Sequence, residues 1–153
     1  MLFACQNQTD TVQIMTTIDA LKEYLTTTHM TFSYKAVMVL ALLNAIDHHG
    51  KSSRATLIRN VHAFYLDRQR RGLPAEKDRE RPSPLIRPDE VTDEQIWQIL
   101  TRYPLDLMDA FIAVEDDDVR IKSALWSQMS AADLIELKEI ALRRIEIYYE
   151  DAE

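Results

Sequence analysis

The chain offers few side chains with the spacing that catalysis requires. It has four histidines and a single cysteine, and none of them forms an H-E-x-x-H, H-x-E or C-x-x-C arrangement that would place ligands around a metal. With only two glycines it cannot assemble a glycine-rich phosphate loop, and no serine lies in a G-x-S-x-G turn. We therefore expect a non-enzymatic protein with no catalytic residue, no metal and no cofactor.

An acidic triplet, Asp116-Asp117-Asp118, is the one run of carboxylates that could hold a hard cation. A calcium loop also needs a glycine and a bidentate glutamate further along the chain, and neither follows the triplet. We interpret the triplet as a solvated turn.

Positive charge is concentrated between Lys51 and Arg87. This segment holds ten basic and four acidic residues, a net charge of +6, whereas the whole chain carries −7. A basic stripe on an acidic protein can contact phosphates while the rest of the surface repels them. The alternative is an ordinary solvated surface. Including two basic residues of a later strand, we predict that any nucleic-acid contact is made by Lys51, Arg54, Arg59, Arg68, Arg70, Arg71, Arg120 and Lys122.

Apolar residues recur at steps of three and four along most of the chain, which predicts helices. Ser33, Ser52 or Ser53, Thr92 and Ser130 are suitable N-terminal caps, and Gly50 and Gly72 are suitable stops. The stretch 37–43 is apolar on nearly every face and should be the buried centre of the domain. The pattern predicts helices over residues 11–27, 33–48, 53–71 and 92–103, and a last one from Ser130 to about Tyr148.

Two segments depart from the helical pattern. Residues 111–114 and 119–122 read as two short strands around the acidic triplet, which predicts one β-hairpin. Four prolines and a mixed-charge run predict a flexible basic, proline-rich loop at about 73–88. We thus predict one mainly α domain over residues 1–153, a compact helical fold with one short β-hairpin. Helices followed by a hairpin also resemble a winged helix, with Arg120 and Lys122 on the wing.

The sequence also indicates where the protein resides. No run approaches the roughly 20 apolar residues needed to span a bilayer, and the N-terminus lacks the basic and apolar regions of a secretory signal. One cysteine cannot form an internal disulfide. We expect a cytoplasmic protein without a membrane partner.

Four short hydrophobic and aromatic stretches are similar to a known domain. They are Phe32-Ser33-Tyr34-Lys35 running into Leu40-Ala41-Leu42-Leu43, Phe64-Tyr65-Leu66-Asp67-Arg68 with Gly72-Leu73-Pro74, Ala124-Leu125-Trp126, and Tyr148-Tyr149. Over roughly residues 31–150 the chain resembles the helical C-terminal domain of some large bacterial superfamily II DNA helicases, including helicases found beside restriction or phage-defence genes. The resemblance implies no catalytic residue, because those proteins hydrolyse ATP in motor lobes that this sequence lacks.

These observations predict a non-catalytic accessory or interaction module. It would dock on a larger nucleic-acid-processing or phage-defence protein and contact DNA or RNA only weakly on its own. The alternatives are an autonomous winged-helix-like DNA-binding regulator and a small enzyme with an unrecognised site. Salt-dependent DNA binding distinguishes the interaction module from the autonomous regulator. Metal- or nucleotide-dependent turnover would support the enzyme.

Overall fold

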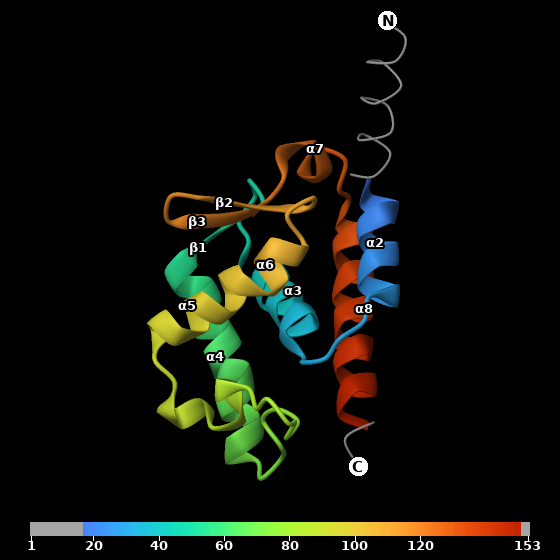
Figure 1. Cartoon of the computed structure of the whole chain (residues 1–153). Coiled ribbons are helices and arrows are strands. Elements are labelled where there is room, and N and C mark those ends of the chain that lie inside the picture. Colours follow the sequence, from blue (N-terminus) through green and yellow to red (C-terminus); the bar gives the residue numbers. More distant parts are fainter. Residues whose placement is uncertain (1–16, 151–153) are drawn as a thin grey trace, which may run out of the picture.

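A computed structural model describes residues 17–150, which form a mainly α fold with a small antiparallel sheet (Figure 1), as predicted. The helices are α2 (Ile18–Thr27), α3 (Tyr34–Ala45), α4 (Arg54–Arg70), α5 (Asp93–Arg102), α6 (Pro104–Leu107), α7 (Ser123–Trp126) and α8 (Ala131–Glu150). The strands are β1 (Lys51–Ser53), β2 (Ile112–Glu115) and β3 (Asp118–Ile121). Two 3-10 turns, Pro84–Ile86 and Pro88–Glu90, precede α5.

Three helices begin at the caps that the sequence predicts. Ser53 Oγ accepts a hydrogen bond from Thr56 N at 3.1 Å. Thr92 and Gln95 form a capping box with N···O distances of 3.2 and 2.9 Å. Ser130 and Asp133 bond reciprocally in the same way, at 3.1 and 2.9 Å. Each cap satisfies backbone N–H groups that the first helical turn leaves free.

Two predicted helix boundaries need correction. Within the described residues the first helix begins at Ile18, where Thr17 Oγ1 accepts from Ala20 N at 3.1 Å; the predicted stretch 11–16 lies outside them. The second helix ends at Ala45 and not at His48. There the Asp47 carboxylate accepts hydrogen bonds from the backbone N–H groups of residues 49 and 51, at 2.8 and 3.1 Å. Such side-chain turns compete with helix continuation, so Gly50 belongs to a turn and not to a helix cap.

The sheet has three strands, so the predicted hairpin is not alone. Strands β2 and β3 form the hairpin, and β1 pairs with the free side of β3, giving the order β1-β3-β2. Lys51 is opposite Arg120 in this added pairing. Val119 and Ile121 of β3 are buried, and Arg120 between them therefore points to the opposite face of the sheet.

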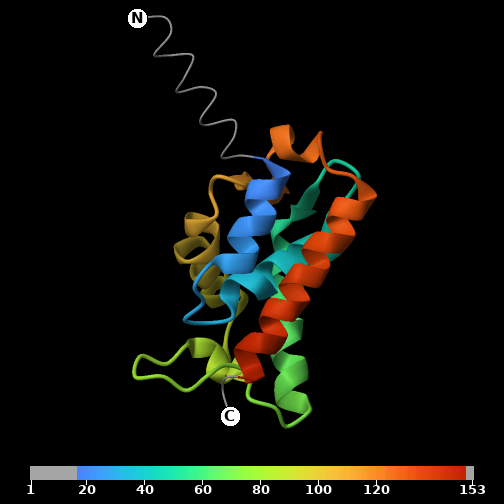
Figure 2. The ribbon, with the colours of Figure 1, turned by 90° about the vertical axis from the view of Figure 1, so that its right-hand side faces the viewer.

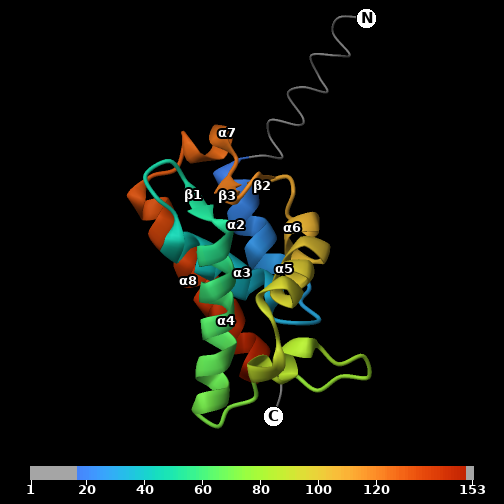
Figure 3. The ribbon, with the colours of Figure 1, turned by 90° about the vertical axis from the view of Figure 1, so that its left-hand side faces the viewer.

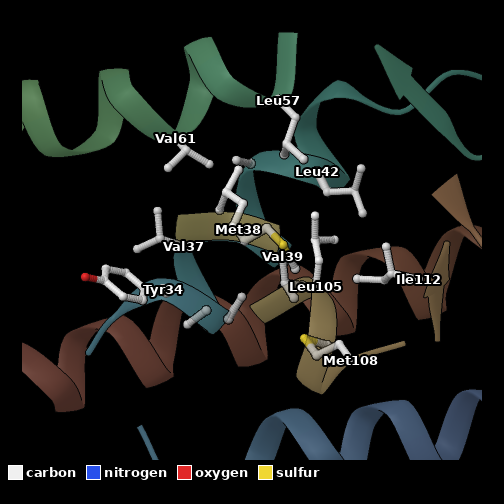
Figure 4. Packing of buried hydrophobic residues seen from close by; sticks show 14 of the residues in the cluster. Tyr34, Val37, Met38, Val39, Leu42, Leu57, Val61, Leu105, Met108 and Ile112 are labelled. Atoms are coloured by element: carbon white, nitrogen blue, oxygen red, sulfur yellow. The ribbon is translucent and has the colours of Figure 1, made fainter. Parts of the chain in front are cut away.

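Helix α3 is the centre of the core (Figure 4), as its uniform hydrophobicity predicts. Helix α8 packs on α3 and has α2 at its side (Figure 2), and α4 packs on α3 from another direction (Figure 3). The prediction that residues 37–43 form the buried centre of the domain is confirmed, and Leu40 alone among them is half-buried, beside α4. Fully buried side chains from neighbouring elements, including Leu57, Ile96 and Met108, complete the cluster.

The segment between α4 and α5 is more firmly anchored than its composition suggests. Apart from the two 3-10 turns it has no regular structure, and residues 78–82 are exposed. Ala75, Glu76, Ser83 and Leu85, however, are all at most 5% exposed. The predicted loop at 73–88 therefore has buried positions, to which Pro88 also belongs, while its flexibility stays a prediction.

An ion pair joins α2 to α8 and makes stability depend on pH. Lys22 Nζ lies 2.8 Å from Asp133 Oδ1 and 2.7 Å from Glu136 Oε2. The hydrogen bond from Lys22, with those from Ser130, lowers the pKa of Asp133 from 3.8 to about 2. Because the folded pKa lies below the unfolded one, this contribution is complete above about pH 4 and is lost as the pH falls toward 2.

Asp133→Asn tests this dependence, because asparagine keeps an oxygen for the Ser130 N–H and removes only the charge. We expect the variant to be less stable than the parent in urea at pH 7, and the difference to shrink progressively between pH 4 and pH 3. A difference that stays constant from pH 7 to pH 3 would show that the ion pair does not stabilise the fold.

Candidate functional site

The predicted basic stripe is divided between the two ends of α4. Helix α4 has 17 residues, which corresponds to about 25 Å. Lys51 is the first residue of β1, the strand that leads into the N-terminal end of α4, whereas Arg68, Arg70 and Arg71 are at the C-terminal end of the helix. Figure 3 shows β1 and the C-terminal end of α4 far apart. The eight predicted residues therefore do not form one continuous surface.

The arginines at the C-terminal end of α4 are engaged within the chain. The Arg68 guanidinium lies 3.4 Å from the centre of the Tyr149 ring, and its Nε donates to Pro74 O at 2.7 Å. Arg70 and Arg71 both pair with Asp67. Arg68 thus ties α4 to α8 and to the following loop, and Asp67 partly neutralises its two neighbours.

Two further predicted residues belong to α4: Arg54 is its first residue, and Arg59 lies further along the helix. Arg54 lies over the Trp97 ring of α5, 4.4 Å from its centre, and 3.8 Å from Glu94. Arg59 is exposed on the helix surface. Neither lines a hollow with Lys51.

At the sheet end, the structure brings Lys51 and Arg120 together in a surface hollow that we call the basic corner. Arg120 is largely covered, with 15% of its side chain exposed, and it makes a loose 3.7 Å ion pair with Glu115. Lys122, the N-cap of α7, follows two positions after Arg120 but does not line the hollow. The basic corner is lined by His48, His49, Lys51, Arg120, Ser123, Trp126 and Ser127.

A close contact between Gly50 and Trp126 shapes this corner. Gly50 has a φ of +75°, and a Cβ on it would lie 2.6 Å from the Trp126 ring. Trp126 Nε1 donates to His48 O at 3.1 Å, and the rings of His48 and His49 are 4.0 Å apart. Only glycine permits the ring to lie this close to the turn, so the turn and α7 hold each other in place.

A second hollow, which we call the aromatic hollow, lies where the loop before α3 meets α6. Phe32 and Tyr34 stack with ring centres 5.1 Å apart, and Tyr34 lies 5.9 Å from Tyr103. Tyr103 and Leu107 are exposed by 45% and 54%. The hollow has a volume of about 440 Å³ and is lined by His29, Met30, Thr31, Phe32, Tyr34, Lys35, Tyr103, Pro104 and Leu107.

A buried polar cluster centres on Glu76, which the sequence analysis placed in the mixed-charge run of the flexible loop. Its carboxylate accepts from Ser33 N at 3.1 Å, Ser33 Oγ at 2.6 Å and Lys77 N at 3.0 Å, and also from the Tyr148 hydroxyl. Ser33 Oγ is in turn bonded to Tyr65 at 2.7 Å. Ser33 precedes α3 as predicted, but its hydroxyl serves Glu76 and does not cap the helix. No local sequence signal marks Glu76, because its partners Ser33 and Tyr148 lie 43 and 72 positions away.

The tyrosines of this cluster act as neutral donors. Burial raises the pKa of Tyr65 and of Tyr148, and the neighbouring Glu76 carboxylate raises both further. At neutral pH their hydroxyl protons remain available to hold Glu76 and Ser33. With Glu76 only 1% exposed, the cluster is inaccessible to a substrate, and we interpret it as an anchor for the loop.

The other candidate residues do not converge. Among residues 17–150, no three His, Cys, Asp or Glu side chains are placed to hold a metal ion. His62 Nε2 is bonded to Pro88 O at 2.7 Å, whereas His49 lies in the basic corner.

No helix within residues 17–150 is long and apolar enough to cross a membrane. Comparison with known proteins finds no matching family model, curated protein or solved structure.

Proposed function

We propose that this protein is a non-catalytic interaction module that docks on a larger cytoplasmic protein of a nucleic-acid-processing or phage-defence system. The aromatic hollow is the observation that carries the proposal. Two large side chains, Tyr103 and Leu107, are left half-exposed beside two stacked aromatic rings. Exposed apolar and aromatic groups that gather around a hollow are typical of protein-binding sites.

The chemistry of the hollow indicates what it binds. Of the described residues that line it, none is acidic, although the chain carries a net charge of −7. Lys35 is part of the wall, and the Arg102 guanidinium lies over the Tyr103 ring, 5.9 Å from its centre. The fitting occupant is an aliphatic or aromatic side chain of a partner segment that carries carboxylates beside it.

The alternative, an autonomous winged-helix-like DNA-binding regulator, has support from topology alone. The helices and strands follow the order α3-β1-α4-α5-α6-β2-β3, in which only the four-residue α6 is additional, and with the sheet order β1-β3-β2 they agree with a winged-helix-like arrangement. In such an arrangement α5 and the hairpin turn would face DNA. Here α5 begins with exposed Asp93 and Glu94, and the turn exposes Glu115, Asp116 and Asp117. These carboxylates repel phosphates, which favours the interaction module.

Co-purification of the tagged full chain from its native cells tests the proposal with a matched pair of variants. Leu107→Asp places a charge in the aromatic hollow. Leu142→Asp, the control, places a charge on the outer face of α8. The two leucines are similarly exposed, Leu107 by 54% and Leu142 by 47%. We expect Leu107→Asp to lose the main co-purifying protein and Leu142→Asp to retain it. Retention by Leu107→Asp, or loss with Leu142→Asp only, would overturn the assignment of the docking surface.

A further inference from the structure

We infer that the basic corner is a phosphate-binding site and that the phosphate belongs to a nucleic acid. The nitrogen-bearing side chains of the corner come from two separate parts of the chain. His48, His49 and Lys51 belong to the turn and strand after α3, and Arg120 belongs to β3. The pairing of β1 with β3 places Lys51 opposite Arg120. The backbone register of the sheet therefore makes these two residues neighbours, whatever conformations their side chains adopt.

The composition of the corner favours an anion. Of the lining residues, all within the described part of the chain, none is acidic and two carry hydroxyls, Ser123 and Ser127. The nearby carboxylate of Asp47 is turned into the backbone, where it accepts from residues 49 and 51. Arg120 Nε donates to Ile121 O at 3.3 Å, and the ion pair of Arg120 with Glu115 is a loose contact, at 3.7 Å. An incoming phosphate can replace this contact with shorter charge-assisted hydrogen bonds.

The corner is also held in shape before a ligand arrives. The Trp126 ring lies against Gly50, and its indole N–H is bonded to His48 O at 3.1 Å. This anchors the histidine turn to α7 on one side, while β-pairing fixes Lys51 and Arg120 on the other. A preorganised site loses less conformational entropy on binding than mobile surface lysines do.

We place the phosphate site only at the sheet end of α4, and not along the whole predicted basic stripe. At the other end of α4, Arg70 and Arg71 share the Asp67 carboxylate, and Arg68 is held by Tyr149 and Pro74. The inference does not depend on the aromatic hollow, which lies against different elements. Either proposal can fail without the other.

The Trp126 indole N–H provides a local readout in NMR spectra of the full chain, and the Trp97 indole serves as an internal reference. Three probes are titrated at low salt: inorganic phosphate, a single-stranded oligonucleotide, and the same oligonucleotide with a 5′-phosphate. We expect both oligonucleotides to shift the Trp126 signal at lower concentrations than inorganic phosphate does. A shift with inorganic phosphate alone would keep the site but overturn its assignment to nucleic acid. No shift with any probe at millimolar concentration would overturn the site itself.

Variants show whether the binding is local. Arg120→Gln and Lys51→Gln should each weaken binding about tenfold, the effect of losing one charge-assisted hydrogen bond, and each should reduce the salt dependence. The double variant Arg70→Gln/Arg71→Gln is the control and should change affinity less than about twofold. Lys51→Gln covers the case in which Arg120→Gln fails to fold. If the control weakens binding as much as Lys51→Gln does, the attraction is diffuse and the site is refuted.

Discussion

Replacing Glu76 with glutamine is expected to lower the free energy of unfolding by about 3 kcal/mol, although the two side chains have nearly the same shape. Every group that contacts the carboxylate donates to it: two backbone N–H groups and the hydroxyls of Ser33 and Tyr148. An amide would turn its NH₂ group toward these donors and leave at least one of them without an acceptor. Urea unfolding at neutral pH measures the effect.

Glu80→Gln is the matched control, because Glu80 belongs to the same segment but is exposed. Its effect should stay within about 0.5 kcal/mol. Equal stabilities of the two variants would mean that the polar cluster does not hold the segment in place. A large loss for Glu76→Gln alone would identify this carboxylate as the residue that anchors residues 75–85 to the helices.

Gly50→Ala should destabilise the protein by about 3 kcal/mol, because two costs are added. A left-handed conformation costs an alanine about 1–2 kcal/mol, and forcing a methyl group into a packed site costs about 1–3 kcal/mol. The nearest ring atoms of Trp126 would be 2.6 and 2.9 Å from the new Cβ. The ring cannot withdraw freely, since its N–H is bonded to His48 O.

Gly72→Ala separates the two costs. Gly72 has the same φ of +75°, but nothing lies within 4 Å of its Cβ position. It should lose only the conformational part, about 1 kcal/mol. Thermal unfolding of both variants, followed by circular dichroism, gives the comparison. Equal losses at the two glycines would show that Trp126 does not pack against the turn as the structure indicates.

The parts of the fold that the sequence predicts are those with local signals. The caps at Ser53, Thr92 and Ser130 are visible because a capping side chain and its target lie three residues apart. The apolar sequence of α3 likewise predicts a buried helix. Strand β1 was missed because Lys51-Ser52-Ser53 has no strand-forming residue, and its conformation is imposed by pairing with β3.

The candidate sites depend on contacts that no local pattern records. The charge pattern of the sequence assigned Lys51 and Arg71 to one basic stripe. In the structure, the length of α4 separates these two residues. Conversely, Arg120 and Lys51 are 69 positions apart and become neighbours only through the sheet. The aromatic hollow similarly depends on the junction of α5 and α6, where Tyr103 lies beside Tyr34 and α6 adds Pro104 and Leu107. Helix α6 has only four residues, too few for a periodic signal.

The partnership of α2 with α8 has a consequence for how the chain folds during synthesis. Lys22 and Asp133 are 111 positions apart, so the ribosome completes α2 long before it makes α8. At the usual rate of elongation this interval is roughly 6–22 s. During this interval α8 is not yet present to pack against the apolar face of α2, which carries Ile18, Leu21 and Leu25. Docking of the first described helix must therefore be among the last steps of folding, and the nascent chain has to shield that face until then.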